Sequence, residues 1–311
     1  INEELDKNPW GVSFLRMLDM TNDSHLFRSR EDLEGKGYEL HGNVLVRDEK
    51  VWLPLYEAKM IEQFDHRFAG VLHFSNRART GEPEVTTIEQ HKEADYSPKF
   101  RYWIDSKVVH DVISFKRKGF IAYKDITTAS SERTLKVSHI PYSAVGNSSP
   151  LIQTADDNTI FKNMCLLSNF NSFVVDYIAR QKIGYLHINF YILEQFPILS
   201  PEKYSQAFLD FIVPRALELT YTAWDLKAFA DDVWEDGGRE TEDGGREMDD
   251  GKLREAIERQ WQANAAETGG GHAGAEPPEW VQYYQPEPPE DPFPHPPFLW
   301  DEERRFRLRA E

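Results

Sequence analysis

The sequence predicts an α+β protein in which a mixed β-sheet is followed by helices. Residues 38–145 are dominated by short runs rich in Val, Ile, Tyr, Phe and Trp, and these runs are bounded by turn residues. From Asn158 onward the apolar residues recur at helical spacing instead. We therefore expect a β-rich part over residues 1–157 and a helical part over residues 158–230.

Six runs read as strands because β-branched and aromatic residues fit a pleated, half-buried surface. They are YELHGNVLV (38–46), KVWLPLYEA (50–58), FAGVLHFS (68–75), KFRYWID (99–105), GFIAYKDIT (119–127) and TLKVSHIP (134–141).

The helical part begins with TIFKNMCLLSNFNSFVVDYIARQKIG, which predicts one helix or two short ones broken near residues 169–172. INFYILEQFPILSP (188–201) reads as a short strand that ends in Pro. Residues 202–230 read as helical, with Pro214 as a kink or a new helix start. The apolar residues at helical spacing in the first segment are Phe161, Met164, Cys165, Phe170, Phe173, Val174, Tyr177 and Ile178.

Composition allows a real core and excludes several classes of protein. The chain has 311 residues, of which 40% are hydrophobic. Its single cysteine, Cys165, lies in an apolar stretch and reads as a buried small hydrophobe in a reducing compartment. No apolar run reaches the roughly 20 residues that span a bilayer. The chain begins at Ile and stops in a helix-like segment, so it reads as a piece of a longer, cytoplasmic protein.

The net charge of −17 is concentrated toward the end of the chain. Residues 231–311 hold 9 Lys and Arg against 22 Asp and Glu. EDGGRE occurs twice there, and residues 268–297 are rich in Gly and Pro. Such composition predicts a flexible acidic insertion over residues 231–297, with one helix at GKLREAIERQWQAN, before a truncated C-terminal helix over residues 298–311.

The sharpest enzymatic hypothesis is a Mg²⁺-dependent nuclease that uses Asp48, Glu57 and Lys59. Carboxylates would hold the metal and the lysine would stabilise developing negative charge. No nucleophile motif and no glycine-rich phosphate loop stands out. The lone histidines, His66 of the Asp65–Arg67 triplet included, favour structural roles. We predict no metal site from them.

The stretch LPLYEAKMIEQFDHRF (53–68) predicts a strand that turns into a helix over residues 59–68. Ile61, Phe64 and Phe68 would then share the core face of that helix. Its polar face would meet a DNA backbone or another domain, and would carry Lys59, Gln63, His66 and Arg67.

Residues 99–136 carry nine basic and four acidic residues, so a basic surface inside an acidic protein is expected. Cations near hydroxyls and amides suit phosphate contact and groove readout. We select cations and hydroxyls from this segment and from residues 59–79 as DNA-binding candidates. They are Lys59, His66, Arg67, Arg77, Arg79, Lys116, Arg117, Lys118, Lys124, Thr127, Thr128 and Arg133.

Several segments resemble one family in its order along the chain. They include NPWGVSFLRMLDMTNDSHLFR, LPLYEAKMIEQFDHRF, AYKDITTASSERTLKVSHIPYSAVGNSSPLI, NFNSFVVDYIARQKIG, HINFYILEQFPI, LELTYTAWDLKAFA and FLWDEERRFRLRAE. They resemble the C-terminal, target recognition half of large type IIG-like N6-adenine DNA methyltransferases of restriction-modification and phage-defence systems.

The resemblance implies a parent enzyme of prokaryotic cytoplasm that binds S-adenosylmethionine in an N-terminal domain. That domain carries an Asn-Pro-Pro-Tyr motif, which this chain lacks, so we expect no catalytic residues and no bound cofactor here. The implied partners are double-stranded DNA, the N-terminal methyltransferase domain and other defence subunits. A scaffold role in a defence complex, with residues 231–297 as the partner-binding tail, stays open beside the nuclease.

Overall fold

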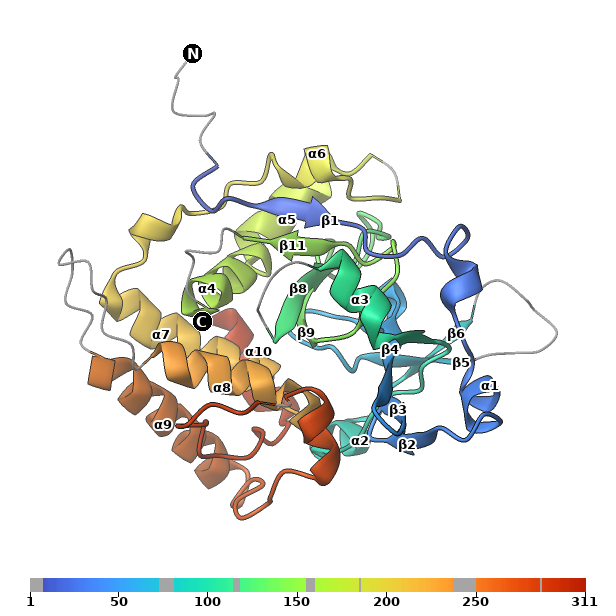
Figure 1. The fold of residues 1–311 in the computed structure, drawn as a ribbon. Helices are drawn as coiled ribbons and strands as arrows, with labels where there is room; N and C mark the ends of the chain where they lie inside the picture. The colour runs from blue at the N-terminus through green and yellow to red at the C-terminus, as the bar shows by residue number, and fades with distance from the viewer. Residues whose placement is uncertain are drawn as a thin grey trace.

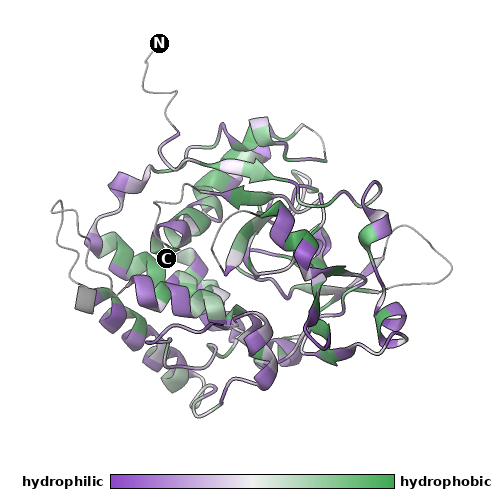
Figure 2. Cartoon of the chain, in the orientation of Figure 1, coloured by the Kyte–Doolittle hydropathy of each residue, from purple (hydrophilic) through white to green (hydrophobic). Residues whose placement is uncertain are grey.

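The computed structural model describes residues 8–72, 81–113, 118–154, 160–184, 186–237, 250–285 and 287–311 (Figure 1). Within these ranges the protein is α+β, as the sequence predicts. The strands precede the longer helices along the chain. Figure 2 shows hydrophobic residues along the central strands and many hydrophilic ones on outer helices such as α9.

One sheet has four strands, each antiparallel to its neighbour, in the order β1–β11–β8–β9. Strand β8 and the edge strand β9 pair along their full length, and every residue of both strands is buried. The strands are β1 (Ser13–Leu15), β8 (Gly119–Tyr123), β9 (Val137–Pro141) and β11 (Leu151–Gln153).

The other large sheet has the order β10–β4–β3–β2, and β7 also pairs with β4. A separate antiparallel pair is formed by β5 and β6. Each of the six predicted strand runs contains a strand, so these predictions are confirmed. The bounds are β2 (Glu39–His41), β3 (Val44–Arg47), β4 (Lys50–Tyr56), β5 (Ala69–Leu72), β6 (Glu82–Val85), β7 (Trp103–Asp105) and β10 (Ala144–Val145).

Of the two alternatives predicted for the start of the helical part, one helix or two, the structure has two helices with a break at the expected place. Asn171 and Ser172 separate α4 from α5, and the Ser172 side chain caps α5 by accepting a hydrogen bond from the Val175 amide. The Asn171 side chain also exchanges two hydrogen bonds with the Val137 backbone, which fixes the break against β9. The helices of this part are α4 (Ile160–Phe170), α5 (Phe173–Lys182), α6 (Phe190–Leu193), α7 (Gln206–Thr220) and α8 (Lys227–Asp236).

Two details of the helical part depart from or refine the prediction. The prediction of a strand over residues 188–201 is wrong, because Phe190–Leu193 form the one-turn helix α6. A short apolar run has no periodicity that separates a strand from a helix. Pro214 lies inside α7, which continues through it. Cys165 is fully buried, as expected, and burial raises the pKa of its thiol to about 12.

The prediction of a flexible insertion is wrong for the part of residues 231–297 that the structure describes. Helix α9 (Asp250–Glu267), which includes the predicted helix, packs against α7 and buries Leu253 and Ile257. Phe293 is buried as well. The composition of the whole segment did not reveal these buried apolar residues, because polar and Pro residues separate them along the sequence.

The Pro-rich segment also packs on the second sheet. Gly42 has a φ of 62° in the turn between β2 and β3, and a Cβ there would lie 2.6 Å from the ring of Trp280. Only glycine allows this approach, so Trp280 covers the β2–β3 hairpin. The remaining helices are α1 (Arg30–Glu34), α2 (Ile88–Lys92), α3 (Ser106–Val112) and α10 (Glu302–Ala310).

The helix predicted over residues 59–68 is wrong. After β4 the chain makes a single 3₁₀ turn, Ala58–Met60, and then runs irregularly. Phe64 has a φ of 58° and its amide donates to the Val137 carbonyl, so its backbone is committed to β9 and not to a helix. The apolar spacing of this stretch reflects burial without helical structure.

Candidate nucleic-acid interface

The nuclease candidates do not form a metal site. Lys59 Nζ lies 3.5 Å from Glu57 Oε2, and Arg101 Nε lies 3.1 Å from Glu57 Oε1, so the Glu57 carboxylate is already neutralised. Asp48 lies at the opposite end of β4, and its side chain is 89% exposed. A strand rises about 3.3 Å per residue, which keeps the two carboxylates far apart. Within the described ranges, no group of three His, Cys, Asp or Glu could hold a metal ion.

The triplet Asp65, His66 and Arg67 lies in the interior, where the β-rich part meets the helical part. His66 Nε2 lies 2.9 Å from Asp225 Oδ1, and Asp65 Oδ2 lies 3.1 Å from His91 Nε2. We call these five residues the buried joint. The guanidinium of Arg67 donates to four backbone carbonyls, those of His91, Glu93, Tyr96 and Thr222.

His66 and Arg67 were predicted to form a polar face toward DNA, and their placement there is wrong, because both are completely buried. Burial lowers the pKa of Arg67, and the charges of Asp225 and Asp65 oppose that shift. A charged side chain inside a protein must be paired and hydrogen-bonded. The buried joint meets this need with carboxylates from both parts of the chain.

The other residues predicted to contact DNA fall into three groups. Arg77, Arg79, Lys116 and Arg117 lie outside the described residues. Lys118 lies beside α8, where its backbone hydrogen-bonds to the Asp232 carboxylate. The remaining candidates lie in the sequence between the end of β4 and the start of β9. They are Lys59, Lys124, Thr127, Thr128 and Arg133.

Among that last group, the two threonines serve the local backbone. The Thr127 amide donates to the Leu186 carbonyl, and Thr127 is buried. The Thr128 hydroxyl hydrogen-bonds to the hydroxyls of Ser130 and Ser131. Lys59, Lys124 and Arg133 remain as cations near one open surface.

A groove with a volume of about 850 Å³ opens beside these cations, between α5, α10 and the segment that leads into β9. Three aromatic rings line it with unusual exposure: Phe173 is 60% exposed, Tyr177 65% and Phe306 68%. Phe173 and Tyr177 are one helical turn apart on α5, whereas Phe306 comes from α10. The groove therefore has aromatic side chains from two separate helices.

Two arginines of the groove share one buried carboxylate. Asp176 accepts hydrogen bonds from the backbone amides of Thr134 and Leu135. Its Oδ2 atom lies 3.6 Å from Arg133 Nη1 and 3.5 Å from Arg180 Nη2. The Arg133 Cζ atom also lies 3.9 Å from the centre of the Phe173 ring, within the range of a cation–π contact.

A lysine cluster adjoins the groove and consists of Lys59, Lys124 and Lys136. Lys136 Nζ lies 2.5 Å from Glu62 Oε2, and both residues line the groove. Burial lowers the pKa of Lys124, and the charges of Lys136 and Lys59 lower it further while Glu62 raises it. Lys124 thus lies within electrostatic range of both other lysines and of Glu62, while Lys59 pairs with Glu57.

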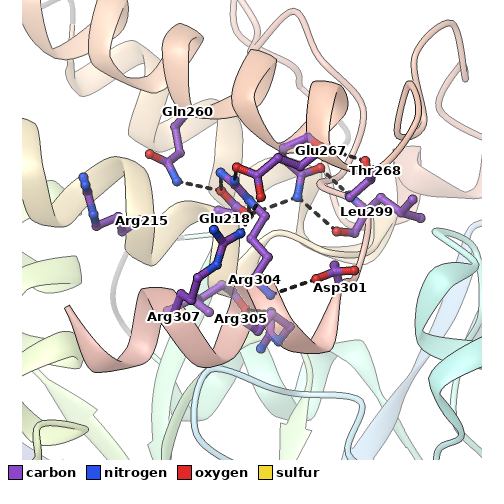
Figure 3. Close-up of polar contacts among 12 residues, drawn as sticks. Arg215, Glu218, Gln260, Glu267, Thr268, Leu299, Asp301, Arg304, Arg305 and Arg307 are labelled. Atoms are coloured by element: carbon purple, nitrogen blue, oxygen red, sulfur yellow. Dashed lines mark hydrogen bonds and ion pairs between the residues drawn. The ribbon is translucent and has the colours of Figure 1, made fainter.

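Helix α10 holds its side of the groove through a buried ion pair with α7 (Figure 3). Arg304 Nη2 lies 2.9 Å from Glu218 Oε2, its Nε also donates to the other Glu218 oxygen, and Nη1 lies 2.6 Å from Glu267 Oε1 of α9. Arg305 donates to the Leu219 carbonyl and lies over the Trp300 ring. These contacts fix α10 so that Phe306 faces the groove.

Sequence reasoning missed Tyr177, Arg180, Phe306 and Arg309 as groove residues, and it placed Phe173 on the apolar stripe of a helix. The buried face of α5 is instead formed by Val175, Asp176 and Ala179. The spacing of Val175 and Ala179 is as helical as that of Phe173 and Tyr177. Only the tertiary packing decides between these two faces.

None of the protein-family models matches the chain, and no match was found among curated protein sequences. Of the helices in the described ranges, none combines the length and the apolar character needed to cross a bilayer. What defines the chain is therefore its α+β fold with a groove that combines exposed aromatic rings and cations.

Proposed function

We propose that the chain is the DNA target recognition region of a site-specific N6-adenine DNA methyltransferase, with the groove and the lysine cluster facing DNA. The methyl transfer would belong to a separate domain that binds S-adenosylmethionine. One observation carries the proposal: cations that are scattered in sequence converge on one surface. Arg133, Lys136, Arg180 and Arg309 line the groove, and Lys59 and Lys124 belong to the lysine cluster beside it.

The acidic net charge of the chain does not oppose DNA binding at this surface. Cations attract phosphates locally because salt screens charges beyond about 8–10 Å. Two of the three acidic side chains that line the groove are already engaged: Glu62 by Lys136, and Asp176 by two arginines and two backbone amides. The third, Glu132, is exposed beside Arg133. Arg309 forms no ion pair with another described residue, so its charge is available to a phosphate.

The test is the salt dependence of binding to duplex DNA. Each phosphate contact adds about 0.9 to the slope of log K against log salt, because bound counterions are released. The double variant Lys136→Gln, Arg309→Gln is expected to bind duplex DNA on the order of tenfold more weakly near physiological salt. Its salt slope should be smaller by about 2.

The matched control is the double variant Arg30→Gln, Arg259→Gln. Both arginines are exposed, each pairs with a glutamate one turn away, and neither lines the groove. This control should bind DNA as the unchanged chain does. Absence of duplex binding even at low salt, or an equal loss in the control, would reject the groove as the DNA surface. Joined to its methyltransferase domain, the chain should direct adenine methylation to one sequence.

A further inference from the structure

We infer that the groove binds an unstacked nucleobase, in single-stranded or extrahelical DNA, by stacking it on the rings of α5 and α10. This inference rests on the proposed function and names the form of DNA that the groove takes. In duplex DNA the base faces are covered by their neighbours, and only edges are presented to a protein. Exposed aromatic side chains offer ring faces, which only an unstacked base can use.

The rings are mounted on rigid supports. The α5 side is fixed by the Ser172 cap and by the hydrogen bonds from Asp176 to the segment before β9. The α10 side is fixed by the ion pair between Arg304 and Glu218. A ring that is already held in place loses little conformational entropy when a ligand arrives, which favours binding.

Aromatic and cationic side chains alternate along the groove. Arg133 covers part of the Phe173 ring, and Arg180 lies one helical turn from Asp176 on α5. On α10, Phe306 and Arg309 are three residues apart and therefore lie on the same face of the helix. Phe173 and Phe306 thus each have a cation beside them, the combination that holds a base and its phosphate together.

The volume suits a small polar ligand more than a helix of another protein. Sites for small molecules occupy roughly 300–1,000 Å³, and the groove has about 850 Å³. An apolar docking groove would also be lined with aliphatic residues, whereas this one alternates rings with charges. These features favour a nucleotide over a partner helix.

The experiment compares binding of the whole chain to a single-stranded oligodeoxynucleotide and to the duplex formed with its complement. Phe306→Ala is expected to weaken single-strand binding about tenfold, in line with the loss of one stacked base. Duplex binding should change by less than about twofold. The matched control is Phe208→Ala on α7, since Phe208 is 56% exposed and does not line the groove.

Phe306→Leu separates stacking from apolar contact. Leucine keeps an apolar side chain but has no ring face, so single-strand binding should fall as it does for Phe306→Ala. If Phe306→Leu binds as tightly as the unchanged chain, the groove is an apolar docking surface and the inference is wrong.

The remaining outcomes separate the inference from the proposed function. Duplex binding without single-strand binding overturns the inference alone. If the unchanged chain binds neither single-stranded nor duplex DNA, the inference and the proposed function are both overturned. Single-strand binding that depends on Phe306 supports the inference even where the duplex binds weakly.

Discussion

The buried joint and the groove lie side by side but use charge in opposite ways. Arg67 is completely buried, and its guanidinium donates to four backbone carbonyls. Arg309 lines an open groove and forms no ion pair with another described residue. The same side chain is therefore a structural link in one place and a candidate ligand contact in the other.

This difference shows why charge in a sequence does not identify a surface. Desolvating a guanidinium is costly, so a buried arginine persists only where its donors are satisfied. Asp225 from the helical part and Asp65 from the β-rich part both raise the pKa of Arg67 against the effect of burial. The joint thus holds together the two parts whose outer surfaces form the groove.

The largest effect expected is that of Arg67→Met. The change leaves the carbonyls of His91, Glu93, Tyr96 and Thr222 without the guanidinium donor and removes a buried charge near Asp225 and Asp65, so the free energy of unfolding should fall by about 5 kcal/mol. Chemical denaturation measures it. The control Arg259→Met, at a side chain that is 67% exposed, should change stability by about 0.5 kcal/mol or less.

A loss of less than about 1 kcal/mol in Arg67→Met would break the comparison. It would mean that Arg67 is not the link between the two parts.

A smaller effect is expected from Arg304→Met, which tests the support of the groove. Glu218 would remain buried without its main partner, and stability should fall by about 3 kcal/mol. Because α10 would loosen, its amide hydrogens should exchange faster and single-strand binding should weaken.

The control for the groove is Arg307→Met, which removes an exposed ion pair of the same helix with Glu267. It should lower stability by no more than about 1 kcal/mol. Unchanged hydrogen exchange in α10 of the Arg304 variant would show that the ion pair does not position the helix.

The fold could be predicted in outline from the sequence, because the periodicity of apolar residues indicates helix or strand for each segment by itself. Local residue types and turn signals predict the strand at 50–56 and the break at Asn171 and Ser172. The segment 59–68 could not be predicted because its structure depends on a distant strand. Phe64 has a positive φ, and its amide donates to the carbonyl of Val137 in β9.

The candidate site was predicted only in part for the same reason. Lys59, Lys124 and Arg133 were selected from local charge, and the structure places Arg133 in the groove and the two lysines in the cluster beside it. Their aromatic neighbours come from α5 and α10, which are far along the chain. Whether Phe173 faces the core or the groove depends on how α5 packs, and helical spacing alone is the same for both.

The smallest effect concerns the pH dependence that Asp65 gives the buried joint. Burial by itself would raise the pKa of Asp65, but the hydrogen bond and charge of His91, with the charges of Arg305 and His66, lower it to about 2. The unfolded value is 3.8. Stability from this carboxylate is therefore present above about pH 4 and is lost as pH falls toward about 2.

Asp65→Asn should lower the free energy of unfolding by about 2 kcal/mol at neutral pH, since one pKa unit corresponds to about 1.4 kcal/mol. Between pH 4 and 2 the variant should lose less stability than the unchanged chain, because the carboxylate that titrates there is gone. Denaturation measured across this pH range tests both statements. Asp48→Asn, at an exposed turn, is the control and should keep the original slope. Equal slopes in Asp65→Asn and the unchanged chain would show that acid does not act through the joint.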